Sequence, residues 1–260
     1  MSTSEREKRI AAFQKLQLRI QTLNLPVMPA QYLDLDLYLN QPSTAKPIVR
    51  FTQAKTSTAW QTSKAGRPLV LVFASAHNPG GGVLRGAKAQ EEDMAVSSTW
   101  FEHVHGCDAF YTHSHENALY DDVGLYVDKA WLMQDEWGYD LDPIQGSMIG
   151  IPSPNLKGLR DQNITLDEHL IYQIYERRCL SLLSFATLSG HDQLIVGAWG
   201  CGVFGLDPQK TAYAFAKSIA TNRYAGEVLF AIPDLSLLTI YQDVFKSMEV
   251  QTHHRLKKNP

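Results

Sequence analysis

The stretch "PLVLVFASAHNPGGGVLRGAKAQEE" (68–92) decides how this chain is interpreted. It opens with the apolar run 68–75, which is too short for a typical helix and is typical of a strand buried on both faces. Three glycines follow (80–82), and then the adjacent carboxylates Glu91 and Glu92. Glycine loses much conformational freedom on folding, and neighbouring carboxylates repel each other. The segment is therefore either a loop without a role or a site built at the end of a strand.

The rest of the chain alternates apolar strands with helical patterns. Helices are predicted over residues 5–23, 56–64, 88–104, 167–188, 208–222 and 235–248, and strands over 47–51, 68–75, 124–133, 147–155, 193–199 and 227–233. Such alternation predicts one α/β domain with a largely parallel or mixed sheet.

The composition excludes several classes of protein. Of the 260 residues, 44% are hydrophobic and 20% are charged, as in ordinary globular proteins, and the net charge of -3 gives no reason to expect general nucleic-acid binding. No apolar run approaches the roughly 18 residues that cross a bilayer. The N-terminus lacks the apolar core of a secretory signal, and the three separated cysteines do not suggest a disulfide framework. We therefore expect a cytoplasmic protein that does not bind membranes.

A second strand also leads into glycines. The run "QLIVGAW" (193–199) is followed by "GCGVFGLDP" (200–208). In open α/β sheets, ligands bind beyond the carboxyl ends of strands, where glycine lets backbone N–H groups approach a phosphate. Neither loop has the GK[ST] of a phosphate loop, and "GCGVFG" lacks the acidic residue that a dinucleotide-binding fingerprint needs about 20 residues later. A nucleotide kinase or Rossmann dehydrogenase is disfavoured, while two structural turns remain possible.

The two glutamates have a geometric constraint. If a helix begins near Lys88, Glu91 and Glu92 lie in its first turns, about 100° apart around the axis. They cannot face each other across a sugar at roughly 5–9 Å, as the usual pair of glycosidase carboxylates does. For glycosidic chemistry, one glutamate must then serve as both acid and base while the other orients a substrate hydroxyl. On residue chemistry alone, a solvated pair on a helix is equally compatible with the sequence.

These residues resemble the GGG-x(6–8)-QEE signature of poly(ADP-ribose) glycohydrolases, since seven residues separate Gly82 from Gln90. The flanking "HNPGGG" and "GAKAQEE" resemble the microbial-type branch, and "VGAWGCGVFGLDP" (196–208) is similar to the family's second motif, the ligand-binding loop of a macrodomain. The resemblance implies a three-layer α/β/α macrodomain-like fold with a mixed central sheet. This catalytic domain would span residues 47–252, with an N-terminal helical extension packed on it (1–46) and a basic tail (253–260).

The resemblance also implies a reaction, the hydrolysis of ribose–ribose O-glycosidic bonds in poly(ADP-ribose) with release of ADP-ribose. Glu92 would be the acid/base, and Glu91 would hold hydroxyls of the substrate ribose. The implied ligand-binding residues are Asn78, Gly80, Gly81, Gly82, Gln90, Gly202, Val203, Phe204 and Gly205. No cofactor and no metal are implied, and the substrate would be the polymer or an ADP-ribosylated protein. Two alternatives stay open: a mono-ADP-ribosyl hydrolase acting on protein or nucleobase, and a non-catalytic ADP-ribose-binding module.

Two other features have plainer interpretations. "HVH" (103–105) and "HSH" (113–115) place four histidines within thirteen residues, and H-x-H spacing can bind zinc on a strand. Because no convincing set of further ligands accompanies them, we expect a polar surface or a supporting role. The aromatic residues Trp137 and Tyr139 are expected to belong to the core rather than to a base-stacking platform.

Overall fold

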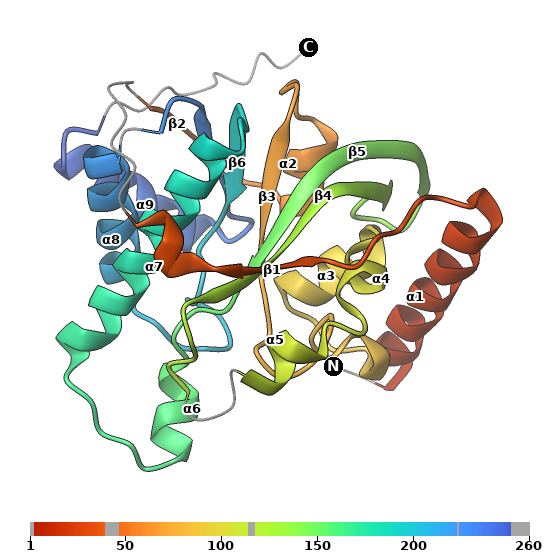
Figure 1. Ribbon diagram of the computed structural model, residues 1–260, viewed down its shortest axis with the longest axis horizontal. Coiled ribbons are helices and arrows are strands. Elements are labelled where there is room, and N and C mark those ends of the chain that lie inside the picture. Colours follow the sequence, from red (N-terminus) through yellow and green to blue (C-terminus); the bar gives the residue numbers. More distant parts are fainter. Residues whose placement is uncertain (1–2, 40–46, 114–117, 223, 251–260) are drawn as a thin grey trace.

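A seven-stranded sheet forms the centre of the computed structural model, which describes residues 3–39, 47–113, 118–222 and 224–250 (Figure 1). The strand order is β1-β4-β5-β3-β6-β7-β2. The strands are β1 (Gln31–Asp34), β2 (Ile48–Thr52), β3 (Pro68–Phe73), β4 (Val123–Gln134), β5 (Asp140–Ile151), β6 (Gln193–Val196) and β7 (Glu227–Ala231). Strand β4 pairs antiparallel with β1 and β5, and the other pairs are parallel. The prediction of a mixed sheet is confirmed.

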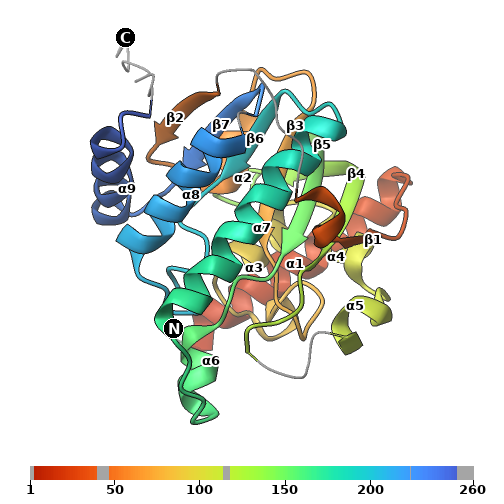
Figure 2. The ribbon, with the colours of Figure 1, turned by 60° about the vertical axis from the view of Figure 1, so that its left-hand side comes forward.

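Helices cover both faces of this sheet (Figures 1 and 2). They are α1 (Thr3–Leu23), α2 (Thr56–Gln61), α3 (Gln90–Ser97), α4 (Trp100–Val104), α5 (Asp108–His113), α6 (Leu156–Asp161), α7 (Glu168–Leu188), α8 (Pro208–Asn222) and α9 (Leu235–Ser247), with 3₁₀ turns η1 (Leu35–Tyr38) and η2 (Val83–Arg85). Helices α7, α8 and α9 pack on one face, and α1 to α5 contribute to the hydrophobic cluster on the other. The three-layer α/β/α fold is therefore as predicted.

Strand β3 shows why its sequence is apolar throughout. Leu69 and Leu71 belong to the hydrophobic cluster on the α7–α9 side, whereas Val70 and Val72 belong to the cluster on the opposite side. Alternate side chains of a strand point to opposite faces, so a strand covered on both sides needs apolar residues at every position. The run thus fixes β3 at the centre of the sheet, directly before the first glycine loop.

The helix predicted over 88–104 is two helices in the structure. Ser98 and Thr99 interrupt it, because Ser98 forms an isolated antiparallel bridge with Leu132 of β4. Thr99 adds a hydrogen bond from its N–H to the carbonyl of Trp131. The Ser98 N–H still donates to the Met94 carbonyl, but the Thr99 N–H makes a sheet-like hydrogen bond in place of a helical one. This break sets the position of Trp100 at the start of α4.

The N-terminal stretch contributes more than a helical extension. Strand β1 lies within it and forms the edge of the sheet beside β4. Helix α1 packs on α3 and η2, and its Phe13 ring meets Phe101 edge-on with the ring centroids 5.0 Å apart. Strand β1 was not expected within this stretch. The division into domains stays a prediction, and the basic tail (253–260) lies outside the described residues.

Two aromatic residues lie elsewhere than expected. Trp137 and Tyr139 are 77% and 72% exposed, between β4 and β5, so the expectation that they belong to the core is wrong.

In the part of the chain that the structure describes, no helix has the length and apolar character needed to span a membrane.

Glu102 predicts a pH dependence of stability. It lies at the contact between α4 and α1, where Gln17 donates to Oε1, while Oε2 is buried with no hydrogen-bond partner among the described residues. Burial raises the pKa of Glu102 from its ordinary 4.5 to about 7. Because the folded state holds this proton more tightly, the stabilisation is present below pH 4.5 and is lost as the pH rises through 7.

We therefore expect Glu102→Gln to raise the free energy of unfolding by about 1–3 kcal/mol at pH 8, relative to its effect at pH 5. Urea unfolding at the two pH values measures this difference. The control is Glu7→Gln, which makes the same change at an exposed position of α1. Equal pH dependence in the two variants would show that Glu102 is not the titrating group.

Candidate active site

A cavity of about 590 Å³ lies beyond the carboxyl ends of the parallel strands. Strands β3 and β6 are neighbours and run parallel, so the glycine-rich loops that follow them meet at one edge of the sheet. The lining residues that come from these loops and from α3 are Phe73, Ser75, Asn78, Gly81, Gly82, Lys88, Ala89, Gln90, Glu91, Glu92, Asp93, Met94, Ala198, Gly200, Gly202, Val203 and Phe204. The two predicted loops therefore border a single cavity.

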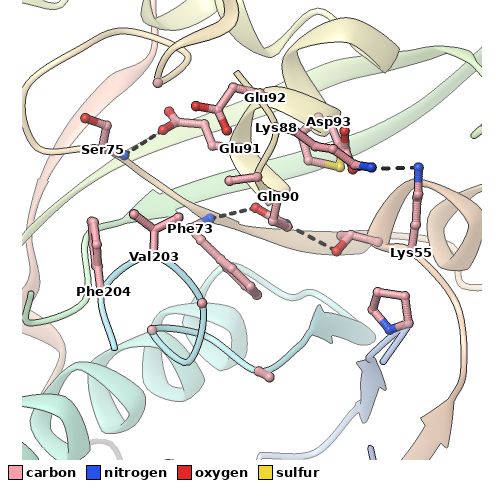
Figure 3. A pocket seen from close by; sticks show the side chains of 18 of the residues that line it. Lys55, Phe73, Ser75, Lys88, Gln90, Glu91, Glu92, Asp93, Val203 and Phe204 are labelled. Carbon is pink, nitrogen blue, oxygen red and sulfur yellow. Dashed lines mark hydrogen bonds and ion pairs between the residues drawn. The ribbon is translucent and has the colours of Figure 1, made fainter. Parts of the chain in front are cut away.

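Gln90 fixes the first turn of α3 against β3. Its Oε1 accepts a hydrogen bond from the Phe73 N–H at 2.9 Å (Figure 3). Its Nε2 donates to the Leu71 carbonyl at 2.9 Å. The same Nε2 reaches Thr56 Oγ1 of α2 at 3.2 Å. Gln90 lines the cavity, but its amide is engaged by the protein and holds the helix that carries both glutamates.

Glu91 is held at both carboxyl oxygens. Oε2 accepts the N–H of Ser75 at 2.7 Å, and Oε1 accepts the indole N–H of Trp100 at 3.2 Å. The side chain is buried, and this burial, with a smaller effect from Glu92, raises its pKa to about 8, against the influence of the two hydrogen bonds. Near neutral pH, Glu91 is therefore mostly protonated, which reduces the repulsion expected between adjacent carboxylates.

Glu92 is held at only one oxygen. Its Oε1 accepts the Gly82 N–H at 2.6 Å, whereas Oε2 is buried and has no hydrogen-bond partner within the described residues. The residue is 7% exposed and lines the cavity. A buried oxygen without a partner is costly, and a bound molecule that donates a hydrogen bond to Oε2 of Glu92 would remove this cost.

The glycine triplet makes room for these carboxyls. Gly81 has φ +65°, and a Cβ there would lie 2.5 Å from Oε1 of Glu92 and 3.1 Å from Oε2 of Glu91. At Gly82, a Cβ would lie 2.7 Å from the Cβ of Ala87. The glycines thus allow the loop to lie directly against the glutamates.

Gly80 has a different surrounding from the one predicted. It has φ +64°, and a Cβ there would lie 2.9 Å from the Phe101 ring. Gly80 is buried and is not among the residues that line the cavity. This glycine lets the loop pack closely on α4, and its contact with a ligand stays a prediction. Asn78 does line the cavity, with an exposed side chain.

The second loop presents backbone amides. Gly202, Val203 and Phe204 line the cavity, and their N–H groups donate no hydrogen bond to any described residue. Consecutive unused N–H groups suit an anion such as a diphosphate. Gly205 has φ +74° and does not line the cavity, so its place in the turn, not a ligand contact, requires glycine.

Several lining residues were not anticipated from the sequence. Lys55, Thr56 and Ser57 follow β2, and Ser153 follows β5. The end of β7, the β7–α9 connection and the first turn of α9 add Ala231, Ile232, Pro233, Asp234 and Leu237. Each of these segments lies at or just beyond the carboxyl end of a parallel strand. Applying the strand-end rule to every predicted strand, and not only to those followed by glycines, would have indicated them.

The first histidine motif has a structural role. His103 is buried, with Nδ1 2.6 Å from the Met28 carbonyl and Nε2 3.1 Å from Thr99 Oγ1, and burial lowers its pKa. No group of three or more metal-ligating side chains occurs among the residues that the structure describes. The second motif (113–115) extends into residues outside that part, so the structure does not test it.

Comparisons with known proteins agree with this geometry. Residues 10–135 match the family model "Microbial-type PARG, catalytic domain". The chain is similar to the structure of poly(ADP-ribose) glycohydrolase (PARG) from Thermomonospora curvata, with 28% identity, a TM-score of 0.79, and coverage of 93% of this chain and 99% of that one. The same enzyme bound to the inhibitor ADP-HPD gives 27% identity, a TM-score of 0.78 and the same coverage.

A second organism supplies a similar structure. PARG from Deinococcus radiodurans in complex with ADP-ribose shows 26% identity and a TM-score of 0.75, covering 84% of this chain and 94% of that one. No curated protein matches the chain in sequence. The resemblance to microbial-type poly(ADP-ribose) glycohydrolases and the macrodomain-like fold, both inferred from the sequence, are confirmed.

Proposed function

We propose that this protein is a poly(ADP-ribose) glycohydrolase, which hydrolyses ribose–ribose O-glycosidic bonds and releases ADP-ribose. The observation that carries the proposal is Glu92, a buried carboxyl with one oxygen held by the Gly82 N–H and the other without a partner among the described residues. The match to the microbial-type PARG catalytic domain and the similarity to enzymes with ADP-ribose or ADP-HPD bound support the same activity.

The cavity suits the parts of an ADP-ribose unit. The ribose that bears the scissile bond lies beside Glu91 and Glu92, while the diphosphate lies against the unused amides of residues 202–204. The side chains of Ile232 and Leu237 give the cavity apolar surface away from the glutamates, which suits the adenine ring. The glutamates thus contact the ribose, and the backbone amides contact the negatively charged diphosphate.

One glutamate performs both proton transfers in the proposed reaction. Glu92 gives a proton to the 2′-oxygen of the departing ribose as the C1″–O bond breaks, and the bond's electron pair leaves with that oxygen. An oxocarbenium-like ribose forms. The Glu92 carboxylate then takes a proton from the water that attacks C1″, which restores the acid. Glu91 holds hydroxyls of the same ribose through a carboxyl that the protein keeps in place.

The proposal extends to the substrate and its location. The polymer is the proposed substrate, free or attached to an ADP-ribosylated protein, and no cofactor or metal enters the scheme. We place the enzyme in the cytoplasm because Cys107, Cys179 and Cys201 are free thiols, as in proteins of reducing compartments.

The test is incubation of the purified protein with poly(ADP-ribose) and, separately, with a mono-ADP-ribosylated protein, with the products identified by chromatography and mass spectrometry. We expect ADP-ribose to be released from the polymer. Release from the mono-modified protein alone would replace the proposal with a mono-ADP-ribosyl hydrolase. ADP-ribose binding without product would indicate a binding module, and absence of binding would overturn every one of these functions.

A further inference from the structure

The indole of Trp100 lies locked beside Glu91. Trp100 is completely buried, and its Nε1 donates to Oε1 of Glu91 at 3.2 Å. The ring packs against Gly150 of β5, where a Cβ would lie only 2.5 Å from Cη2 of the indole. Because only glycine leaves this space, the central sheet fixes the position of the ring and therefore the direction of its N–H.

The break between α3 and α4 attaches the same residue to β4. The Trp100 backbone N–H donates to Ser98 Oγ at 3.3 Å, and Ser98 bridges to Leu132. The neighbouring Thr99 binds Trp131 of β4 twice, through its N–H and its Oγ1, each at 3.0 Å. Trp100 is thus held by strands β4 and β5, whereas the carboxyl it contacts belongs to α3.

We propose that Trp100 is a positioning residue for the glycosidic reaction, whose indole N–H fixes the Glu91 carboxyl so that the substrate ribose is held against Glu92. This inference rests on the function proposed above. The Ser75 N–H holds the other oxygen of Glu91, so rotation of the carboxyl about its terminal bond would break both hydrogen bonds. Without the indole N–H, the Ser75 N–H is the one remaining donor to the Glu91 carboxyl in these two contacts, and the carboxyl can rotate.

The hydrogen bond from Trp100 also affects the protonation of Glu91, which can be measured. The titratable groups that face Glu91 are Glu92, on the same helix, and Tyr111 of α5, whose own pKa is raised well above its ordinary value by burial. The Ser75 and Trp100 N–H groups favour the ionised form of Glu91 and lower its pKa. Removing the Trp100 donor should therefore raise the pKa of Glu91, by about one pH unit.

Trp60 of α2 offers a matched control. It is as deeply buried as Trp100, and it packs against Gly146 of the same strand β5, where a Cβ would lie 2.7 Å from its Nε1. Its Nε1 has no hydrogen-bond partner in the described part of the chain. Trp60→Phe therefore removes an equally buried indole ring that packs on the same strand, without removing a hydrogen bond to a carboxyl.

The experiment compares the wild type, Trp100→Phe and Trp60→Phe. An infrared pH titration follows the protonated carboxyl band that Glu91→Gln abolishes, and steady-state kinetics on poly(ADP-ribose) are measured with the same proteins. For Trp100→Phe we expect the Glu91 band to titrate about one pH unit higher. We also expect kcat to fall about 10- to 100-fold with a smaller change in KM. Trp60→Phe should leave the midpoint of the Glu91 titration unchanged.

A folded Trp100→Phe protein whose Glu91 titrates as in the wild type would overturn the inference, as would an equal shift in Trp60→Phe. If Trp100→Phe does not fold, incorporation of benzothienylalanine at position 100 keeps the ring's size and replaces the N–H by sulfur, and the same shift is expected. The infrared titration needs no turnover. A shifted Glu91 in a protein that does not cleave the polymer would refute the proposed function, whereas an unshifted Glu91 in an active enzyme would refute only the role of Trp100.

Discussion

Glu92→Gln is expected to lower kcat for poly(ADP-ribose) by about 100- to 10,000-fold, the range typical of losing a general acid–base group. Glutamine has nearly the same volume, and its amide oxygen can still accept the Gly82 N–H that now binds Oε1 of Glu92. It cannot give a proton to the leaving oxygen or take one from water. Polymer hydrolysis measures the loss, and calorimetric titration with ADP-ribose should show that the cavity still binds its product.

Glu102→Gln is the matched control for this variant. It makes the same change at a half-buried glutamate of the same layer, in α4 and outside the residues that line the cavity. We expect its kcat to stay within about twofold of the wild type, in the manner of changes away from a site. Turnover by Glu92→Gln within tenfold of the wild type, with normal folding, would show that another group transfers the proton.

Gly81→Ala is expected to remove activity to a similar extent without unfolding the protein. Gly81 has φ +65°, and its new Cβ would lie 2.5 Å from Oε1 of Glu92 and 3.1 Å from Oε2 of Glu91. The left-handed backbone costs about 1–2 kcal/mol for alanine, and the collision displaces both carboxyls. Because a displacement of about 1 Å can cost 100-fold in rate, we expect kcat to fall at least about 100-fold.

Gly138→Ala separates backbone strain from the collision. Gly138 has φ +83°, and nothing lies within 4 Å of the Cβ it would gain. Both variants should lose similar free energy of unfolding in urea, but only Gly81→Ala should lose activity at a temperature where both are folded. If Gly81→Ala retains wild-type kcat, the glycine is not required by the glutamates.

Local sequence patterns predicted the layers of this fold. The apolar run of β3 and the long pattern of α7 both stand where expected, because each is specified by its own residues. The break between α3 and α4 was not predictable in this way. Residues 88–104 are compatible with one helix, and the pairing of Ser98 and Thr99 with β4, more than thirty residues later, interrupts it. Non-local pairing of this kind leaves no local signal.

The candidate site was likewise predictable from the sequence only in part. The motif indicated both glutamates and both loops, and the structure brings them to one cavity. The sequence suggested that all three glycines of the first loop meet the ligand, whereas Gly80 meets the Phe101 ring. The contact from Trp100 to Glu91 was also hidden, because residues nine apart in a helix would not reach each other in this manner. The contact of Gly80 with Phe101 and that of Trp100 with Glu91 both depend on how α4 packs, which the neighbouring sequence does not indicate.

The two glutamates differ most in how many of their carboxyl oxygens already accept a hydrogen bond from the protein. Glu91 has both oxygens held and is mostly neutral near pH 7, while Glu92 has one oxygen held and one without a partner among the described residues. Two charged carboxylates beside a diphosphate would disfavour binding, so a neutral Glu91 also makes the site more suitable for an anionic ligand.

The most direct test is the single-turnover rate of polymer cleavage with enzyme in excess, for Glu92→Gln beside Glu91→Gln. When the enzyme concentration also lies well above the dissociation constant, all of the substrate is bound and the rate constants report the chemical step. We expect both variants to bind ADP-ribose and Glu92→Gln to be the slower, by at least about tenfold. Equal rate constants, or a slower Glu91→Gln, would contradict the assignment of the proton transfers to Glu92.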